Sequence, residues 1–328
     1  MESIDRSQPG DIRFIPLTVS GAVHPEEADG QTTGRFVLAL MEESRVQPAE
    51  QDVLVISSKI SSFFEAGRVV RLAEVIPSRK ARLLGRLFQR DPRKIQLVLE
   101  EGDVFLVIPM RRIIRIPSMR RMLERRSANP AAMRRGFERT NNYTFVVNKH
   151  AVYLDEAGID HTNSPDEYVS LLPRDPCETA RGIREEIRDR HGVDVAVILS
   201  DTVTCVGRMG SQDIAIGYSG IDPITRAMFS DDLFGIPRSG GMDLVIDSIA
   251  GMAGLVMGQT TERRPAVLVR GLDYEPERQD GDSGMAAVAM PPGSMWRITL
   301  HTILTTLAFR IASALALQRK PRRPEARR

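Results

Sequence analysis

Three short apolar runs constrain the fold of this chain more than any other feature. DVLVISS (52–58), VDVAVIL (193–199) and PAVLVRGL (265–272) are almost continuously apolar and rich in valine, isoleucine and leucine. Runs of this length and composition are typical of strands that are covered on both faces of a sheet. Helical patterns separate them along the chain. We therefore expect a mixed α/β fold around a buried sheet.

Periodicity and breaker residues predict further elements of this fold. A fourth strand is expected at IRFIPLTV (12–19), and YTFVVN with AVYLDEAG predicts a hairpin around Lys149-His150. The predicted helices cover 34–44, 78–101 with a break at Asp91-Pro92, and 177–192 with Gly192 as the stop.

Length and composition limit the classes of protein to which the chain can belong. At 328 residues, 42% of them apolar, it is long enough for two domains of roughly 150 residues or for one large one. A net charge of +2 favours neither nucleic acid nor membrane as a partner of the whole chain. Cys177 and Cys205 have neither the spacing of a metal site nor that of a disulfide framework, which fits a reducing compartment.

The two ends of the chain carry no pattern that predicts insertion into a membrane. MESIDRSQPG lacks the features of a signal peptide, and no apolar run reaches about 18 residues without a charge. We therefore expect a cytoplasmic protein. Near the C-terminus, one helical face collects five apolar residues, and we expect it to pack on the core: Leu300, Leu304, Leu307, Ile311 and Leu315.

The segment Met110–Thr140 differs in composition from the rest of the chain. It holds ten arginines against Glu124 and Glu138. One interpretation is a helical insertion that faces solvent or another subunit; the other is a grip for a polyanion such as nucleotide phosphates, an acidic substrate or RNA. Since Phe137 is its single aromatic residue, base stacking on the segment has little support, and nucleic acid is not an expected partner.

Oxygen-bearing side chains recur near the ends of predicted strands. Asp160 lies in EAGIDHTN, the pair Asp201-Thr202 follows a predicted strand, and Asp213 lies in SQDIAIG. Hard cations such as Mg²⁺ and Mn²⁺ bind carboxylate and hydroxyl oxygens and take phosphates and water as further ligands. Asp160 and Asp201 could therefore hold a metal without histidine or cysteine, although aspartate beside glycine or threonine is also common in turns and helix caps.

The loop that follows Asp201-Thr202 suggests phosphate chemistry without a standard motif. Neither a GxxxxGK[ST] loop nor a GxGxxG fingerprint occurs in the sequence. Glycines in CVGRMGSQ and GYSGIDP allow either close approach of backbone to phosphate or simple turns. Arg208 could stabilise the charge of a transferring phosphoryl group, or could be a solvated loop residue.

Taken in order, these segments resemble one family, the coenzyme F-420:L-glutamate ligases (gamma-glutamyl ligases). The resemblance covers most of the chain outside the Arg-rich segment and the C-terminal region. It rests on DVLVISSKISSFFEAGRVV, DPRKIQLVLE, EAGIDHTN, LLPRDP, SDTVTCVGRMGSQDIAIG, SGIDP, GLVMGQ and PAVLVRG. It implies an unusual two-lobed α/β fold with the core at 1–109 and 141–290, an Arg-rich insertion at 110–140, and a C-terminal helix and basic tail at 291–328.

The resemblance also implies the chemistry. Such ligases use GTP and two divalent cations, Mg²⁺ or Mn²⁺, form homodimers, and phosphorylate an acceptor carboxylate that the amine of glutamate then attacks. Asp160 and Asp201 resemble ligands of one metal, and Thr202 and Gln259 resemble the surroundings of the second. The remaining positions resemble nucleotide contacts: Ser58, Lys59, Asn163 and the stretch MGQTTERR, which begins with Met257, Gly258, Gln259 and Thr260.

The chain departs from the family pattern at several positions of the implied site. Phe63 stands most nearly where the family has a nucleotide-contacting lysine, and Glu156 replaces the first asparagine of N-A-G. The run Thr204–Gly207 replaces family residues before Arg208, which is retained. Loss of the charged hydrogen bond between that lysine and the nucleotide would cost about 1.5–3 kcal/mol of binding free energy. The arginines of the insertion could supply the positive charge of the missing lysine instead.

Three functions remain compatible with the sequence. The first is addition of L-glutamate to the deazaflavin coenzyme F-420 precursor, and the second is amide ligation to a different acceptor or of a different amino acid. The third is a non-catalytic descendant that binds nucleotide or a polyanion. The retained Asp160 and Asp201 favour an enzyme, whereas Phe63 and Thr204–Gly207 favour a changed one.

Overall fold

A computed structural model describes the chain over residues 11–28, 30–139, 141–162, 164, 168–205, 208, 210–278, 284–291 and 293–316. The chain divides into two compact units, one that ends at Val288 and one that begins at Ala289. The first unit holds every strand that the structure describes, whereas the second holds the helix α10 (Ser294–Ala316).

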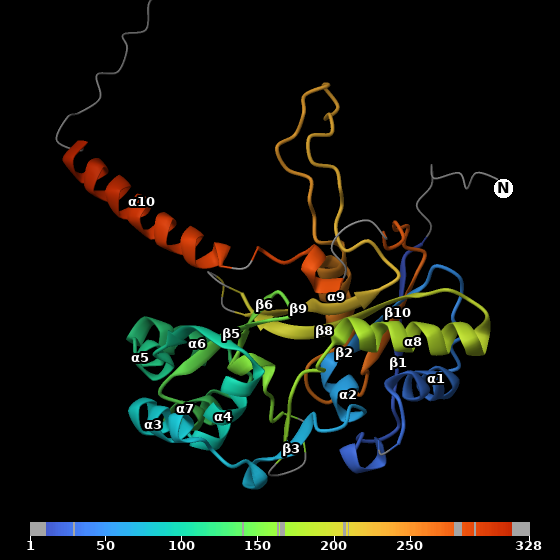
Figure 1. Ribbon diagram of the computed structural model, residues 1–328, viewed down its shortest axis with the longest axis horizontal. Helices are drawn as coiled ribbons and strands as arrows, with labels where there is room; N and C mark the ends of the chain where they lie inside the picture. The colour runs from blue at the N-terminus through green and yellow to red at the C-terminus, as the bar shows by residue number, and fades with distance from the viewer. Residues whose placement is uncertain are drawn as a thin grey trace, which may run out of the picture. The chain divides into compact units, whose positions relative to one another are not determined.

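A five-stranded mixed sheet forms the centre of the first unit (Figure 1). Its strands lie in the order β1 (Arg13–Leu17), β10 (Ala266–Arg270), β2 (Val53–Ser57), β8 (Ala196–Thr204) and β9 (Ser211–Ser219). Neighbouring strands are antiparallel except β2 and β8, which are parallel with Ser57 opposite Ser200. The three apolar runs of the sequence are thus the three adjacent inner strands β10, β2 and β8, as expected.

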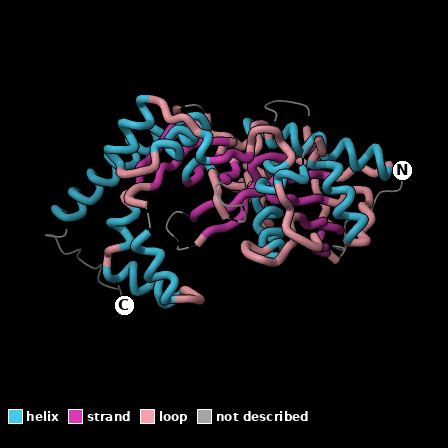
Figure 2. The backbone as a smooth tube through the Cα atoms, turned by 90° about the horizontal axis from the view of Figure 1, so that it is seen from below, coloured by secondary structure: helices cyan, strands magenta, loops and turns pink. Residues whose placement is uncertain are grey.

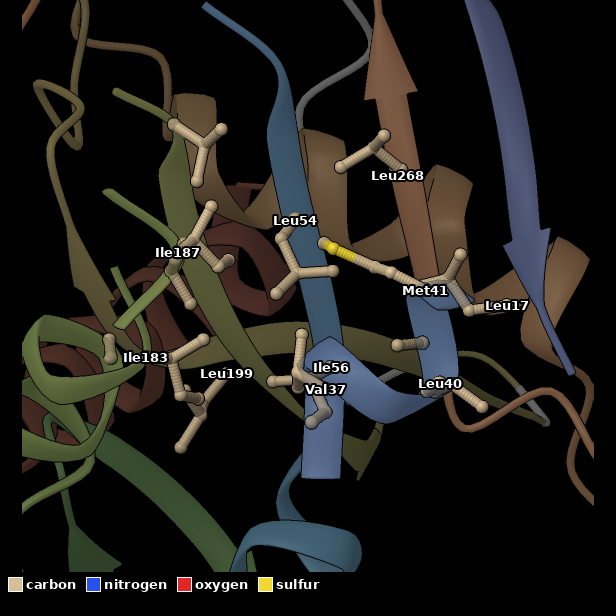
Figure 3. Close-up of a cluster of buried hydrophobic side chains, with 14 of the residues drawn as sticks. Leu17, Val37, Leu40, Met41, Leu54, Ile56, Ile183, Ile187, Leu199 and Leu268 are labelled. Atoms are coloured by element: carbon tan, nitrogen blue, oxygen red, sulfur yellow. The ribbon is translucent and has the colours of Figure 1, made fainter. Parts of the chain in front are cut away.

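Helices cover both faces of this sheet, which explains why the apolar runs of its inner strands β10, β2 and the first half of β8 face both ways without a polar side (Figure 2). On β2, Leu54 and Ile56 pack with α1 (Thr33–Glu43) and α8 (Pro176–His191), as Figure 3 shows. The alternate residues Val53 and Val55 pack with α9 (Val245–Met257) on the other face. Full burial of both faces supplies the hydrophobic stabilisation of the sheet.

A smaller lobe is built on a three-stranded antiparallel sheet, β4 (Asp103–Ile108), β5 (Thr144–Lys149) and β6 (Val152–Asp155). Apolar residues of α3 (Arg79–Phe88) and α4 (Pro92–Glu101) pack on it. The Arg-rich insertion connects β4 to β5 as three short helices, α5 (Met110–Ile114), α6 (Pro117–Arg126) and α7 (Pro130–Arg139). A two-stranded sheet pairs β3 (Val69–Arg71) with β7 (Tyr168–Ser170). In sequence, β3 precedes the elements of the smaller lobe and β7 follows them.

Most of the predicted elements are confirmed, and their boundaries follow local chemistry. Asp91 caps α4 by accepting a hydrogen bond from the backbone N–H of Arg93 at 2.9 Å, and Pro92 opens the helix. Gly192 ends α8 with φ of 71°, a left-handed conformation that favours glycine. The hairpin turns at His150, as the sequence predicts.

One expectation about local structure is wrong. Asp201 and Thr202 do not follow a strand; they lie inside β8, because pairing with β9 extends that strand to Thr204. Four residues of the predicted apolar face of α10 are more than half exposed, and the packing of this face on the core stays a prediction: Leu300, Leu304, Leu307 and Ile311. Leu315 has no described side chain. Within the described ranges, no helix has the length and apolarity needed to cross a bilayer.

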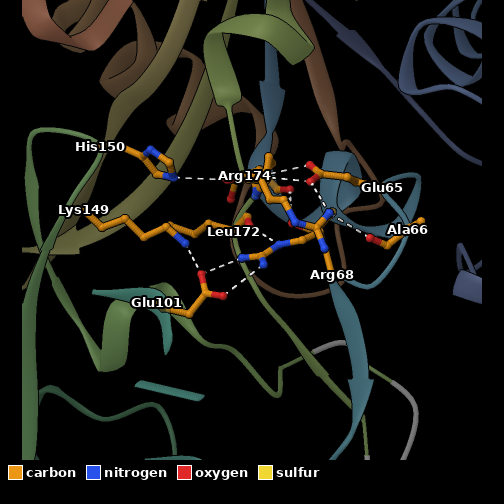
Figure 4. Close-up of polar contacts among 11 residues, drawn as sticks. Glu65, Ala66, Arg68, Glu101, Lys149, His150, Leu172 and Arg174 are labelled. Atoms are coloured by element: carbon orange, nitrogen blue, oxygen red, sulfur yellow. Dashed lines mark hydrogen bonds and ion pairs between the residues drawn. The ribbon is translucent and has the colours of Figure 1, made fainter. Parts of the chain in front are cut away.

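A cluster of buried charges joins the elements of the smaller lobe (Figure 4). The guanidinium of Arg68, just before β3, donates to both carboxylate oxygens of Glu101 at 3.0 and 2.6 Å. The ammonium of Lys149, at the end of β5, pairs with the same carboxylate. Burial opposes ionisation of Glu101, but its two cationic partners outweigh it and hold its pKa below the usual value.

Replacing Glu101 should therefore destabilise the protein strongly. In Glu101→Gln, Arg68 and Lys149 stay buried without a counter-charge, so we expect the free energy of unfolding to fall by about 3 kcal/mol. Because the pKa of Glu101 is depressed, its stabilising contribution is present above the usual carboxyl pKa and is lost as the pH falls through the folded value. Urea unfolding at several pH values measures both effects, and exposed Glu100→Gln is the control. Equal stability of the two variants would contradict this account.

Candidate functional site

The described residues of the first unit enclose a cavity of about 760 Å³ at the end of the central sheet. Five segments far apart in sequence line it: the loop after β1, the helix α2 (Ser58–Phe63), residues 155–162 and 164 from the end of β6 onward, the β8–β9 hairpin, and residues 257–265 from the end of α9 to β10. Both polar and charged side chains face this space. A cavity of this size suits a small-molecule ligand.

The parallel pairing of β2 with β8 determines which residues meet at this cavity. Since Ser57 lies opposite Ser200, the residues that follow them, Ser58 and Asp201, emerge at the same edge of the sheet. The Ser58 hydroxyl donates a hydrogen bond of 3.2 Å to Oδ1 of Asp201. Two residues 143 positions apart in sequence are thereby joined.

Asp201 is held where a negative charge is unfavourable. The surrounding protein removes water from its carboxyl, and this desolvation raises its pKa to about 6. Donation by Ser58 and by the backbone N–H of Thr202 lowers the pKa in part, whereas the charges of Asp160 and Asp213 raise it further. A cation bound beside Asp201 would relieve this repulsion.

Asp160 is held as an ionised carboxylate by its neighbours. Lys59, from the first turn of α2, forms an ion pair with it, and the backbone N–H of Thr162 donates to Oδ1 at 2.7 Å. Burial opposes ionisation, but these donors prevail and lower the pKa of Asp160. The backbone of Asp160 bridges to Ser170 of β7, which fixes its position. Lys59 and Asp160 thus bring opposite charges to the wall of one cavity.

A second polar group lies across the β8–β9 hairpin. Thr202 and Asp213 face each other in register, and the threonine hydroxyl donates to Oδ1 of Asp213 at 2.7 Å. Gln259, which follows α9, donates to the same oxygen at 2.9 Å, and its own Oε1 is 3.1 Å from the Thr202 hydroxyl. A side chain at Gly254 would place its Cβ 2.1 Å from Oδ2 of Asp213, so glycine there makes room for the carboxylate.

The donor set fits a hard divalent cation that shares its ligands with a bound phosphate. Asp160, Asp201 and Asp213 supply carboxylate oxygens, Thr202 a hydroxyl and Gln259 an amide oxygen, which are the ligand types that Mg²⁺ and Mn²⁺ prefer. Among the described residues, no three histidine, cysteine or acidic side chains are grouped closely enough to hold a metal on their own. Oxygens from a ligand would have to complete the coordination.

Most of the predicted site residues meet at this cavity. Lys59, Asp160, Asp201 and Thr202 line it together with Met257, Gly258, Gln259 and Thr260. Ser58 is buried behind Asp201. Asn163 lies outside the described residues. Arg208 is exposed in the β8–β9 turn and is absent from the described lining of the cavity, so its catalytic role stays a prediction.

The structure adds a residue that sequence reasoning did not assign to the site. Asp213 is 7% exposed and lies at the centre of the Thr202–Gln259 group; the alternating pattern of SQDIAIG, which predicts a strand paired with β8, is the signal that could have placed it there. Arg263 and Arg264, at the end of the MGQTTERR stretch that the resemblance implied, bring two further cations to the lining. Their guanidinium groups each donate to a backbone carbonyl, at 3.0 and 3.2 Å.

The departures from the family pattern have structural explanations. Phe63 is buried and contributes an apolar wall to the cavity. Glu156 accepts two hydrogen bonds from Arg90, at 3.0 and 2.7 Å, so its carboxylate is part of the smaller lobe rather than of the cavity. No described residue of the insertion lines the cavity. The structure therefore gives no support to the hypothesis that arginines of the insertion replace the missing lysine.

Sequence comparisons show which proteins the chain is similar to. A profile of the family described as F420-0:Gamma-glutamyl ligase matches residues 25–271. The Coenzyme F420:L-glutamate ligase of Methanopyrus kandleri is 32% identical over 281 residues, which cover 86% of this chain and 95% of the relative. The protein of the same name from Methanothermobacter thermautotrophicus is 28% identical over 254 residues, 77% of this chain and 87% of its own.

These matches identify the class of the protein as an amide-forming ligase. The chain belongs to the F420-0:gamma-glutamyl ligase family, as its sequence motifs predict. The mixed α/β architecture agrees with the fold class expected for that family.

The strained charge of Asp201 should be measurable as a cost in stability. The pKa of Asp201 is about 6 in the folded protein, above the unfolded value near 4. The free energy of unfolding therefore carries no cost from this group below about pH 4, and it falls as the pH rises through about 6. In buffer free of divalent cations, Asp201→Asn should be more stable than the wild type at pH 7.5 by about 1–3 kcal/mol and nearly equal at pH 4. Urea unfolding checks this, with exposed Asp189→Asn as the control; a less stable Asp201→Asn at pH 7.5 would be inconsistent with it.

Two glycines of α9 provide a matched test of the Asp213 group. Gly254→Ala must displace the Asp213 carboxylate and should lower the free energy of unfolding by about 1–3 kcal/mol through overpacking. At Gly251 an added Cβ meets only the Asp213 carbonyl oxygen at 3.4 Å, so Gly251→Ala should be neutral or stabilising by up to about 1 kcal/mol. Thermal unfolding of both variants measures the difference, and equal stabilities would show that Asp213 is not confined by α9.

Proposed function

We propose that the protein joins L-glutamate to the deazaflavin coenzyme F-420 precursor, using GTP and Mg²⁺ or Mn²⁺. The observation that carries this proposal is the convergence of Asp160, Asp201 and Lys59 on one cavity at the end of the parallel strand pair. The names of the most similar relatives supply the acceptor and the amino acid.

The charges of the cavity suit a triphosphate. Lys59, Arg263 and Arg264 provide cations that can pair with phosphate oxygens. The carboxylates of Asp160, Asp201 and Asp213 would hold up to two divalent cations, which neutralise charge that develops during phosphoryl transfer. In the proposed site, Ser58 orients Asp201, while Met257, Gly258, Thr260 and Asn163 contact the nucleotide.

The proposed reaction has two steps with an acyl phosphate between them. An oxygen of the acceptor carboxylate attacks the γ-phosphorus of GTP, and the bond to the β-phosphate breaks to release GDP. The amine of L-glutamate then attacks the acyl carbon, inorganic phosphate leaves, and the amine loses a proton to form the amide. Arg208 would stabilise negative charge on the transferring group if the β8–β9 turn carries it to the cavity.

An apolar arm supports the further proposal that the protein is a homodimer. Between β9 and α9, residues 225–243 project from the first unit as a long two-legged loop (Figure 1). Its apolar side chains are at least 61% exposed at Phe229, Leu233, Phe234 and Ile236. Exposed apolar groups that gather in this way mark sites of protein association, and a second copy would cover them.

Nucleotide binding tests the proposed function most simply. We expect GTP with Mg²⁺ or Mn²⁺ to raise the unfolding temperature, because a ligand at 100 times its Kd adds about 2.7 kcal/mol to stability. GDP should act more weakly, and GTP without a divalent cation should have little effect. Asp201→Asn should lose the metal-dependent shift and the turnover of acceptor, GTP and L-glutamate to amide, whereas Asp189→Asn should keep both.

Two outcomes would redirect the proposal. If a nucleotide raises the unfolding temperature but no amide forms from the F-420 precursor, a different acceptor becomes the better proposal. Phe63, which departs from the family pattern and lies in the cavity wall, makes this the second candidate. Absence of any shift with a triphosphate and metal would remove the cavity as a nucleotide site and favour a binding protein without catalysis.

A further inference from the structure

The Arg-rich insertion encloses a second cavity of about 210 Å³ within the first unit. Four of its six lining residues are arginines. Each of the three helices of the insertion contributes one, and the fourth lies in the link between α5 and α6. The lining consists of Arg111, Ile114, Arg115, Arg120, Arg134 and Phe137. None of these residues lines the larger cavity, so the two spaces are separate.

Positive charge at this cavity exceeds the negative charge that neighbours supply. Glu124 accepts a hydrogen bond of 3.1 Å from Arg120 and lies 4.0 Å from a guanidinium nitrogen of Arg134. Arg111 donates to the neutral amide oxygen of Asn142 at 3.2 Å. Among the described side chains, Arg115 has no ion-pair partner. The one described carboxylate, Glu124, thus reaches two of the four guanidinium groups, and the other two can pair with an anionic ligand.

The arginines are arranged to recognise oxyanions rather than bases. The guanidinium of Arg120 lies over the ring of Phe137 at 5.7 Å, which fixes its plane and covers one face of the single aromatic side chain in the lining. A planar guanidinium matches the two oxygens of a phosphate or carboxylate group. Since a water molecule takes about 30 Å³, a cavity of about 210 Å³ can hold more than one such group.

We propose that this pocket of the insertion binds a small oligoanion that carries at least two phosphate or carboxylate groups. Two kinds of molecule carry such closely spaced anionic groups. One is a polyphosphate chain such as that of a nucleotide, and the other is a chain of γ-linked glutamates. The second source rests on the proposed function, because a ligase for L-glutamate handles products that carry additional carboxylates. The pocket itself is assigned from its own charge and shape and does not depend on that function.

Binding of two probes to the full chain tests the proposal. Tripolyphosphate and γ-linked triglutamate are titrated calorimetrically in low salt without divalent cations. The pocket variant is Arg115→Gln with Arg134→Gln. Its matched control is Arg121→Gln with Arg125→Gln, which removes the same charge from positions of α6 that are exposed like Arg115 and Arg134 but do not line the cavity. We expect the pocket variant to bind at least one probe about tenfold or more weakly, and the control to change less than about twofold.

The outcomes separate the ligand sources and distinguish this proposal from the proposed function. A loss confined to tripolyphosphate assigns a phosphate ligand, and one confined to triglutamate assigns a carboxylate chain; either supports the pocket. Equal weakening in both variants would mean diffuse attraction to the insertion and would overturn it, as would no binding of either probe by the wild type. Unchanged binding in the pocket variant would place the ligand elsewhere and also overturn it. Asp201→Asn should leave the pocket intact, so failure of ligase activity does not affect this test.

Discussion

The parallel pairing of β2 with β8 is the constraint on which the rest of the site depends. It places Ser58 and Lys59, at the start of α2, beside Asp201, and the antiparallel return through β9 then brings Asp213 opposite Thr202. Helices on both faces bury this part of the sheet completely, so its register is fixed by the packing of alternate residues. The cavity therefore lies at the end of the buried part of the sheet, and its walls come from α2, the β8–β9 hairpin and loops.

The same pairing explains the electrostatic character of the site. Beyond its apolar run β8 reaches the cavity with Asp201, and Asp160 and Asp213 line the same cavity. Lys59 compensates the charge of Asp160, but Asp201 stays poorly solvated and has a raised pKa. A site that is destabilised without its ligand is common where a protein must bind charge strongly. More carboxylates than cationic groups line this cavity, whereas arginines are the only charged residues that line the cavity of the insertion.

The sequence was sufficient for the inner strands, the long helices and the family, because continuous apolar runs and capping residues act locally. It also named eight of the residues that line the cavity, through the resemblance of its motifs. Asp213 was not assigned because its role comes from cross-strand pairing, which local patterns do not encode. The exposure of Leu300, Leu304, Leu307 and Ile311 in α10 was likewise unforeseen, since an apolar helical face does not specify what covers it.

The central claim is that the carboxylates of Asp160, Asp201 and Asp213 and the residues at the start of α2 form one site for a divalent cation and a nucleotide. Electron paramagnetic resonance of free Mn²⁺, recorded during a titration with GTP present, tests it directly. The account predicts that the wild type and Asp189→Asn withdraw up to two Mn²⁺ per chain from solution, that this depends on GTP, and that Asp201→Asn loses most of the uptake. Equal, GTP-dependent uptake by Asp201→Asn would contradict the assignment of this cavity.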